Sequence, residues 1–172
     1  MTDFVKQEKI DRLYLRMAFT WSENSYAIRR QVGCLIVKNN SIISDGYNGT
    51  PSGFRNICEF EPDADKRFNE NCTHKDLVND YIAGRRLVTY PYVLHAESNA
   101  IAKLAKSGNS SEGATIYVTD EPCLECSKMI IQSGIRRVVY SRSYRTLDGI
   151  ELLKKANIEI KQITSLTNSK IK

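Results

Sequence analysis

The sequence predicts an α/β domain in which helices pack on a sheet. After residue 95, segments with the pattern of strands alternate with segments typical of helices. The length of 172 residues suits one domain with a substantial hydrophobic core. The sequence shows no internal repeat, no low-complexity segment and no apolar run of about 18 residues, so a repeat protein or a membrane-spanning chain is not expected.

The first 53 residues predict one helix, a strand pair and a loop. A helix is expected over residues 4–22, where an apolar stripe at helical spacing consists of Phe4, Ile10, Leu13, Met17 and Trp21. A buried strand follows over 33–37, and Asn39-Asn40 provides a tight turn into a partner strand over 41–45. Residues 46–53 hold three glycines and a proline, which indicates a loop.

The segment from about residue 54 to residue 92 is polar, charged and only weakly periodic. We interpret it as an insertion into a single catalytic domain that spans residues 1–172. It is expected to carry one short helix near residues 75–86.

The rest of the chain predicts three helices and three strands in alternation. Helices are expected over 96–106, 123–133 and 147–156, the first burying Ala100, Ile101 and Leu104, with glycines 108 and 134 closing the first two. Strands are expected over residues 114–119, 136–141 and 158–163. The tail from residue 164 is polar.

Composition and charge limit the function classes. The net charge of +5 fits an anionic small molecule at least as well as nucleic acid, and neither nucleic acid nor a membrane is expected as a partner. No signal-peptide pattern is seen, so the expected location is the cytoplasm, or the host cytoplasm for a viral protein. An odd number of cysteines, five, favours metal ligands or free thiols over disulfides in such a compartment, and Cys34 is expected in the core.

Two short motifs carry most of the functional information, His95-Ala96-Glu97 and Pro122-Cys123-Leu124-Glu125-Cys126. His95, Cys123 and Cys126 can hold Zn²⁺ and leave a fourth position for water, which is the layout of a catalytic zinc site. Both motifs begin predicted helices, whose N-termini stabilise thiolates. Glu97 stands two residues from His95 and is the candidate catalytic residue for proton transfer. A zinc ribbon would need a second C-x-x-C, which is absent.

On these motifs the chain resembles the cytidine deaminase superfamily. Within it, the narrower resemblance is to the deoxycytidylate (dCMP) deaminases, carried by residues 46–53 (GYNGTPSG), 90–93 (YPYV), 95–101 (HAESNAI) and 130–135 (IIQSGI). The resemblance implies a three-layer fold with a mixed five-stranded sheet flanked by helices. It also implies a homo-oligomer, often a hexamer, and zinc-dependent hydrolysis of dCMP to dUMP and ammonia, which feeds dTMP synthesis. In that reaction hydroxide attacks C4 of cytosine while Glu97 moves the protons.

The resemblance also implies a set of substrate contacts. Asn48 would bond a sugar hydroxyl, and Ala96 would contact the substrate between the two motif residues. Thr119 and Glu121 would border the base, and Tyr144 would form an aromatic wall.

The nucleotide phosphate requires positive charge, and four residues are candidates from their positions. Arg29 and Arg30 are preferred over Lys128 and Arg145 as nucleotide contacts, at either a substrate or an effector site. The alternative for each of the four is an ordinary charged residue on the solvated surface. Many members of the family are activated by dCTP and inhibited by dTTP with Mg²⁺. The loop residues Gly46, Tyr47 and Gly49 are the other candidate effector contacts.

The insertion contains candidate ligands for a second, structural zinc. Some dCMP deaminases carry such a site, and here Cys58, Cys72 and His74 could contribute to it. A closed site needs four ligands, and a carboxylate from Glu59, Glu61 or Asp63 could complete it. The alternative is that these residues are free thiols and a surface imidazole.

Two other functions stay open at this point. A tRNA adenosine deaminase, or a cytosine or cytidine deaminase, shares the zinc motifs, but a tRNA enzyme typically has a denser basic face than a net charge of +5 indicates. A non-catalytic, zinc-stabilised binding module belongs to a different class, and it would have no need of Glu97 beside an open metal position.

Overall fold

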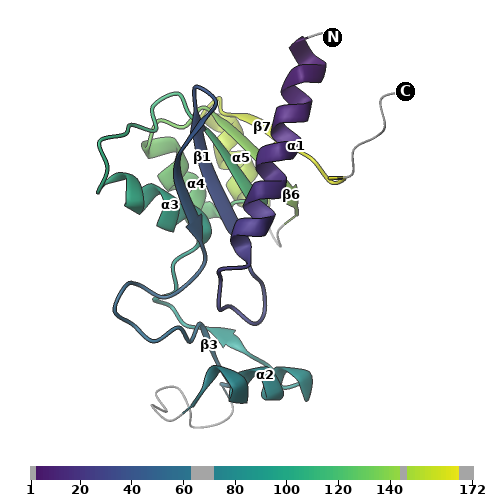
Figure 1. Cartoon of the computed structure of the whole chain (residues 1–172), viewed down its shortest axis with the longest axis vertical. Coiled ribbons are helices and arrows are strands. Elements are labelled where there is room, and N and C mark those ends of the chain that lie inside the picture. The colour runs from purple at the N-terminus through teal and green to yellow at the C-terminus, as the bar shows by residue number, and fades with distance from the viewer. Residues whose placement is uncertain (1–2, 63–71, 144–146, 167–172) are drawn as a thin grey trace.

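A mixed five-stranded sheet forms the centre of the molecule in the computed structural model, which describes residues 3–62, 72–143 and 147–166 (Figure 1). The strands lie in the order β2-β1-β5-β6-β7. β1 is antiparallel to both β2 and β5, whereas β5, β6 and β7 are parallel to one another. Their bounds are β1 Gly33–Lys38, β2 Ser41–Tyr47, β5 Thr115–Asp120, β6 Arg137–Arg142 and β7 Glu159–Gln162. This confirms the predicted fold class.

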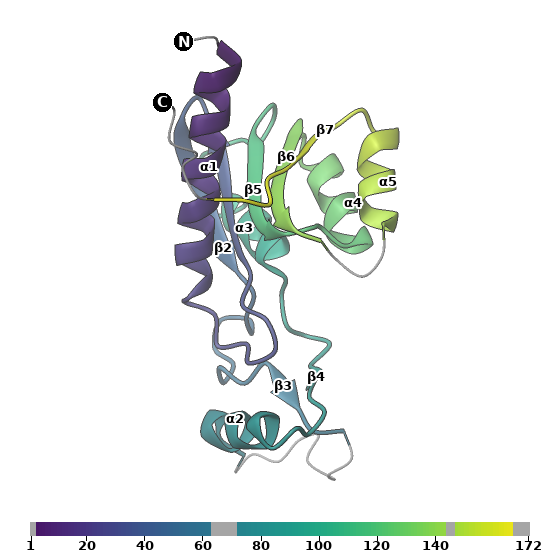
Figure 2. The ribbon, with the colours of Figure 1, turned by 90° about the vertical axis from the view of Figure 1, so that its right-hand side faces the viewer.

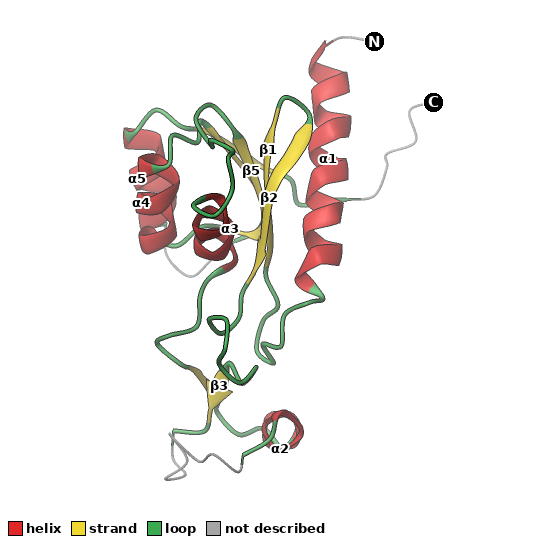
Figure 3. Ribbon diagram, turned by 60° about the vertical axis from the view of Figure 1, so that its left-hand side comes forward, coloured by secondary structure: helices red, strands yellow, loops and turns green. Residues whose placement is uncertain are grey.

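Helices cover both faces of the sheet. α1 (Asp3–Ser22) lies on one face, and α3 (Ala96–Leu104), α4 (Leu124–Gln132) and α5 (Asp148–Lys155) lie on the other (Figure 3). Each of these helices was predicted from the sequence, with ends that differ by a few residues. Within the described ranges, no helix combines the length and apolarity needed to cross a membrane.

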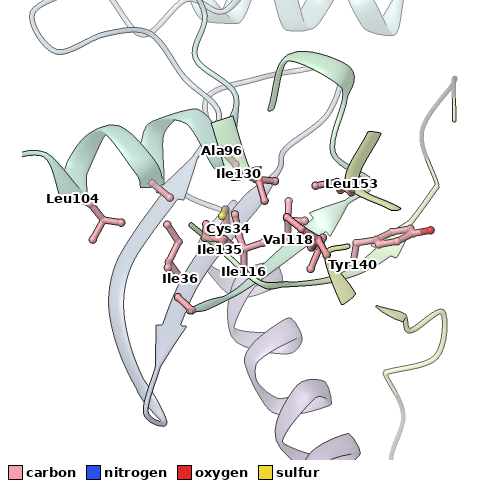
Figure 4. Close-up of a cluster of buried hydrophobic side chains, with 14 of the residues drawn as sticks. Cys34, Ile36, Ala96, Leu104, Ile116, Val118, Ile130, Ile135, Tyr140 and Leu153 are labelled. Carbon is pink, nitrogen blue, oxygen red and sulfur yellow. The ribbon is translucent and has the colours of Figure 1, made fainter. Parts of the chain in front are cut away.

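The core has two parts, one on each face of the sheet. The larger part packs the sheet against α3, α4 and α5, and it includes Cys34, as predicted (Figure 4). The smaller part packs the sheet against α1, with Leu15 and Ala18 facing Leu35, Tyr117 and Val139. Because both faces are covered, β1 and β5 are buried over most of their length rather than at alternate residues.

The face of α1 that packs on the sheet is not the predicted apolar stripe. Asp11, Leu15, Ala18 and Ser22 are buried, whereas Leu13, Met17 and Trp21 are exposed. Asp11 can be buried because Arg137 donates two hydrogen bonds to its carboxylate, at 2.7 and 2.8 Å, and the Tyr117 hydroxyl donates a third. The periodicity therefore predicted the helix correctly but assigned its buried face wrongly.

A small lobe projects from the main body beyond the end of α1 (Figure 2). It contains β3 (Glu59–Phe60), α2 (His74–Ile82) and β4 (Val88–Thr89), with β3 antiparallel to β4. α2 was predicted, and Thr73 and Asp76 form a capping box at its start. The strand pair was not predicted, since two residues are too few to show a period.

The lobe coincides with the segment interpreted as an insertion. The interpretation of the whole chain as one catalytic domain with that insertion stays a prediction.

One glycine controls how closely α3 approaches the sheet. A Cβ atom at Gly46, in β2, would lie 2.2 Å from the carbonyl oxygen of Ala96 and 2.7 Å from the backbone nitrogen of Ala100. Both are helix backbone atoms, so they cannot move aside independently of α3. Gly46 therefore sets the position of the helix that begins beside His95.

Gly46→Ala is expected to lower the free energy of unfolding by about 2 kcal/mol, because the added methyl group pushes α3 away from β2. Urea unfolding followed by circular dichroism measures the change. Gly108→Ala is the matched control, since a Cβ there meets nothing within 4 Å. Equal stability of the two variants would contradict the close approach described above.

Candidate active site

The predicted zinc ligands lie together at the C-terminal end of β5, where two helices begin. His95 is the N-cap residue of α3, with φ −73° and ψ 158°, and Cys123 is the N-cap residue of α4, with φ −71° and ψ 170°. Cys126 lies in the first turn of α4. The N-terminus of each helix presents unpaired N–H groups and the positive end of the helix dipole, so negatively charged sulfur is stabilised there.

The distances among these ligands fit zinc. The Nδ1 atom of His95 lies 3.4 Å from the Sγ atoms of both Cys123 and Cys126, and the three atoms lie within 4.8 Å of one another. Tetrahedral zinc with ordinary bond lengths places nitrogen and sulfur ligands about 3.6 Å apart. One imidazole and two thiols therefore form a donor set that can hold Zn²⁺ with one position left over.

The three ligands also compete for protons. Hydrogen bonds from Cys126 and His95 lower the pKa of Cys123 to about 3 despite its partial burial. The contact with Cys123 in turn raises the pKa of both Cys126 and His95. Because zinc requires two thiolates and a neutral imidazole, its binding would release protons from Cys126 and His95.

Glu97 is buried beside this group. It is the second residue of α3 and only 4% exposed, and burial raises its pKa to about 7. A carboxyl group that titrates near neutral pH can both accept and return a proton. This position is compatible with the proton-transfer role predicted for Glu97.

A cavity of about 710 Å³ opens onto the site, and several separate parts of the chain line it. The ends of α3, β5 and α4 contribute the floor, which contains His95, Glu97 and Cys123. The segment before β1 contributes Arg29, Arg30 and Val32. The lobe contributes a further wall, which consists of Glu59, Tyr81, Val88, Thr89 and the neighbouring Val93. Asn48 and Ser143 also line the cavity.

Only some of the predicted substrate contacts that the structure describes line this cavity. Ala96, Glu121 and Asn48 line it. Asn48 also holds the segment before β1, since its amide accepts from the Val32 N–H at 2.8 Å and donates to the Arg30 carbonyl at 2.9 Å. Thr119 is fully buried, and its hydroxyl oxygen accepts hydrogen bonds from Gly33 and Arg142. Tyr144 lies outside the described residues.

The three residues proposed as effector contacts have structural partners. Gly46 and Tyr47 end strand β2, so the loop predicted from residue 46 begins two residues later. Gly46 packs under α3, and Tyr47 offers its carbonyl oxygen to the amide of Asn99 at 2.9 Å. Gly49 exchanges two backbone hydrogen bonds with Leu94, at 2.9 and 3.1 Å. None of the three is among the residues that line the cavity. An effector role for them stays a prediction.

Arg29 and Arg30 are the two arginines among the described residues that line the cavity. Both also line a second cavity of about 740 Å³. Arg30 forms an ion pair with Asp120, and Arg29 donates to the Thr89 hydroxyl at 3.3 Å. Of the other two candidates, Lys128 forms an ion pair with Glu125 on the surface, and Arg145 lies outside the described residues.

The structure does not bring the candidates for a second zinc site together. In the part of the chain that is described, His95, Cys123 and Cys126 form the only group of three metal-ligating side chains with clustered donor atoms. Cys58 is buried, Cys72 is partly exposed, and the ring nitrogen Nε2 of His74 lies 3.0 Å from the Tyr26 carbonyl oxygen.

The carboxylates considered for that site are also engaged elsewhere. Glu59 accepts hydrogen bonds from the backbone N–H groups of Ile28 and Arg29, and Glu61 forms an ion pair with Arg85. Asp63 lies outside the described residues. The second zinc stays a prediction.

Sequence reasoning missed two charged residues beside the cavity, Asp120 and Arg142. They end β5 and β6, two neighbouring parallel strands, and they occupy paired positions in the sheet. Charged residues at the C-terminal ends of parallel strands often serve ligand sites, and that signal was present in the sequence. The contribution of Tyr81, Val88 and Thr89 to the wall could not be predicted, since it depends on how the lobe folds back.

Comparison with known proteins identifies the family. Residues 8–142 match the family model described as the cytidine and deoxycytidylate deaminase zinc-binding region. The chain belongs to this family. A His/Cys/Cys group that fits Zn²⁺ is therefore found in a member of a zinc-binding family.

Individual members of the family are similar over most of the chain. The deoxycytidylate deaminase of Enterobacteria phage T4 is 34% identical over 165 residues, which cover 85% of this chain and 86% of that protein. The Homo sapiens deoxycytidylate deaminase is 36% identical over 129 residues, covering 74% of this chain and 61% of that protein.

Solved structures agree with this assignment. The dCMP deaminase from cyanophage S-TIM5 in complex with dCMP and dUMP is 37% identical, with a TM-score of 0.72 over 95% of this chain and 99% of that one. A Thermotoga maritima deaminase/reductase at 21% identity and a TM-score of 0.60 shares the fold.

Cys126→Ser is expected to lose most of its bound zinc, because a hydroxyl replaces one of the two thiolates. Cys72→Ser is the matched variant, since Cys72 lies outside the clustered ligands. Elemental analysis of the purified proteins measures zinc per chain. Full zinc content in Cys126→Ser would contradict the assigned ligand set, and a lower content in Cys72→Ser would support the second site in the lobe.

Proposed function

We propose that this protein catalyses the hydrolytic deamination of dCMP to dUMP and ammonia, with Zn²⁺ held by His95, Cys123 and Cys126. The observation that carries the proposal is the buried Glu97 beside a His/Cys/Cys group, with Glu97, His95 and Cys123 lining one cavity. We infer that dCMP is the substrate from the membership of the deaminase family and from the names of the relatives. A binding module stabilised by zinc would not require a buried carboxyl group at an open metal position.

The reaction needs a nucleophile and a group that moves protons. Zn²⁺ held by His95, Cys123 and Cys126 would lower the pKa of water in the fourth position to about 7 and so would supply a nucleophile at neutral pH. Glu97 takes a proton from the attacking water and delivers it to N3 of the cytosine ring. It then takes the proton of the hydroxyl group now on C4 and passes it to the amino group, so that the C4–N bond breaks, ammonia leaves and the C4 carbonyl forms.

Burial makes Glu97 suited to both halves of this cycle. Its pKa of about 7 lies close to the working pH, so neither the protonated nor the ionised form is strongly disfavoured. Glu97 lies in the first turn of α3, whose N-cap residue is His95, so the start of this helix holds the carboxyl group near the imidazole. The floor of the cavity therefore combines the metal ligands and the proton carrier.

The proposed substrate also needs a binding site for its phosphate. Arg29 and Arg30 are the candidates, because they line the same cavity as Glu97 and a guanidinium group binds phosphate through paired hydrogen bonds. Asn48 supports this arrangement, since its amide fixes the backbone of Arg30 and Val32. Ala96 and Glu121 lie where they can border the nucleoside.

Regulation by dCTP and by dTTP with Mg²⁺ is part of the proposal. Its support is the second cavity, which Arg29 and Arg30 share with the first. A ligand bound in the second cavity would change the positions in which these two arginines contact the substrate.

A homo-oligomer is also proposed. Leu13, Met17, Trp21 and Ile42 expose apolar surface on α1 and the edge strand β2, and a second copy of the chain would cover it.

Glu97→Gln is expected to lower kcat for dCMP by about 10³-fold while zinc content and fold are kept, since the amide cannot carry protons. Ammonia release and elemental analysis on one sample measure both properties. Glu125→Gln on the exposed side of α4 is the control and should retain native activity. Native turnover by Glu97→Gln would contradict the proposed mechanism.

A further inference from the structure

Two arginines hold one carboxylate at the edge of the candidate active site. Arg30 donates to Asp120 from Nε at 3.0 Å and from Nη2 at 2.8 Å. Arg142 donates to the same carboxylate from Nε at 2.5 Å and from Nη2 at 3.2 Å. Each oxygen of Asp120 therefore accepts one hydrogen bond from each guanidinium group.

Arg142 has partners on several elements of the fold. Its Nη2 atom also donates to the Gln31 carbonyl oxygen at 2.9 Å and to the Thr119 hydroxyl at 3.2 Å. Its guanidinium group lies over the ring of Phe19 in α1, 5.1 Å from the ring centre. These contacts join the end of β6 to α1, β5 and the segment before β1, so the position of Arg142 does not depend on a ligand.

The two arginines differ in which cavity they reach. Arg30 lines both the candidate active site and the second cavity, and its side chain is 46% exposed. Arg142 lines only the second cavity. Arg142 therefore acts on a ligand in the active site from outside that cavity, and Asp120 and Arg30 form the charged link between them.

The charge balance of the active-site cavity makes Arg142 important. Arg29 and Arg30 are the described arginines that line it, but Glu59, Glu97, Asp120 and Glu121 line it as well. A carboxylate paired with a single arginine has no net charge. Arg142 supplies a second positive charge to Asp120, so that the group of Arg30, Asp120 and Arg142 carries a net charge of about +1.

We propose that Arg142 is a positioning residue for the substrate phosphate. Through Asp120 it holds the guanidinium group of Arg30 in the cavity and leaves the three-residue group positively charged. The protein therefore favours nucleoside monophosphates over nucleosides. This inference rests on the proposed function and adds a residue that sets its substrate preference.

The test compares dCMP with deoxycytidine, which lacks the phosphate. Arg142→Met keeps an apolar stem against Phe19 and removes the charge. KM for dCMP is expected to rise about tenfold and kcat to stay within about twofold, since a lost charge weakens phosphate binding rather than chemistry. The kcat/KM for deoxycytidine should not change. The difference in KM for dCMP should shrink in high salt, because salt screens charges that are not fully buried.

Three further variants control this experiment. Arg142→Lys keeps the charge and should remain closer to the native KM for dCMP than Arg142→Met does. Arg142→Gln is a second neutral variant in case Arg142→Met does not fold. Arg136→Met removes a positive charge from an exposed arginine whose ion pair is with Glu112, and it should leave both substrates unaffected.

Each outcome decides the proposal. A selective loss for dCMP in the neutral variants supports it. An equal loss for dCMP and deoxycytidine, or no loss for either, overturns it and leaves the proposed function intact. Native protein that binds zinc but does not turn over dCMP would overturn both proposals together.

Discussion

The candidate active site depends on the convergence of two helix N-termini at one end of the sheet. His95 begins α3, Cys123 begins α4, and their donor atoms meet because both helices pack on the same face of adjacent strands. Gly46 lets α3 lie directly against β2, and β5 leads into α4. A zinc ion bound here would link the two helices, so metal affinity and the stability of their packing are coupled.

The lobe and the arginine segment complete the site around this centre. Glu59 is buried in β3, and its carboxylate accepts the backbone N–H groups of Ile28 and Arg29, at 3.2 and 3.4 Å. Burial raises the pKa of Glu59, although those hydrogen bonds oppose the shift. The lobe that walls the cavity is thus tied to the segment that carries its arginines. The position of that segment depends on Asn48, Glu59 and Asp120 together.

The sequence was most informative where chemistry or periodicity is local. The grouping of His95, Cys123 and Cys126 beside Glu97 could be predicted from their spacing, and the helices and core strands from their patterns. The buried face of α1 could not, because Asp11 is compensated by Arg137, which lies 126 positions away. The partners of Asp120 were missed for the same reason, since Arg30 and Arg142 meet it only in the folded chain. Contacts between distant charges leave no periodic signal.

The most direct test of the account measures zinc content and ammonia release on one sample of the native protein, with dCMP, CMP, deoxycytidine and dCTP as substrates. We expect about one zinc ion per chain at the clustered ligands and rapid turnover of dCMP, well ahead of deoxycytidine. Bound zinc with turnover of deoxycytidine but not dCMP would contradict the assigned substrate. Bound zinc with no turnover of any of the four substrates would contradict the assignment of this protein as a zinc-dependent deaminase.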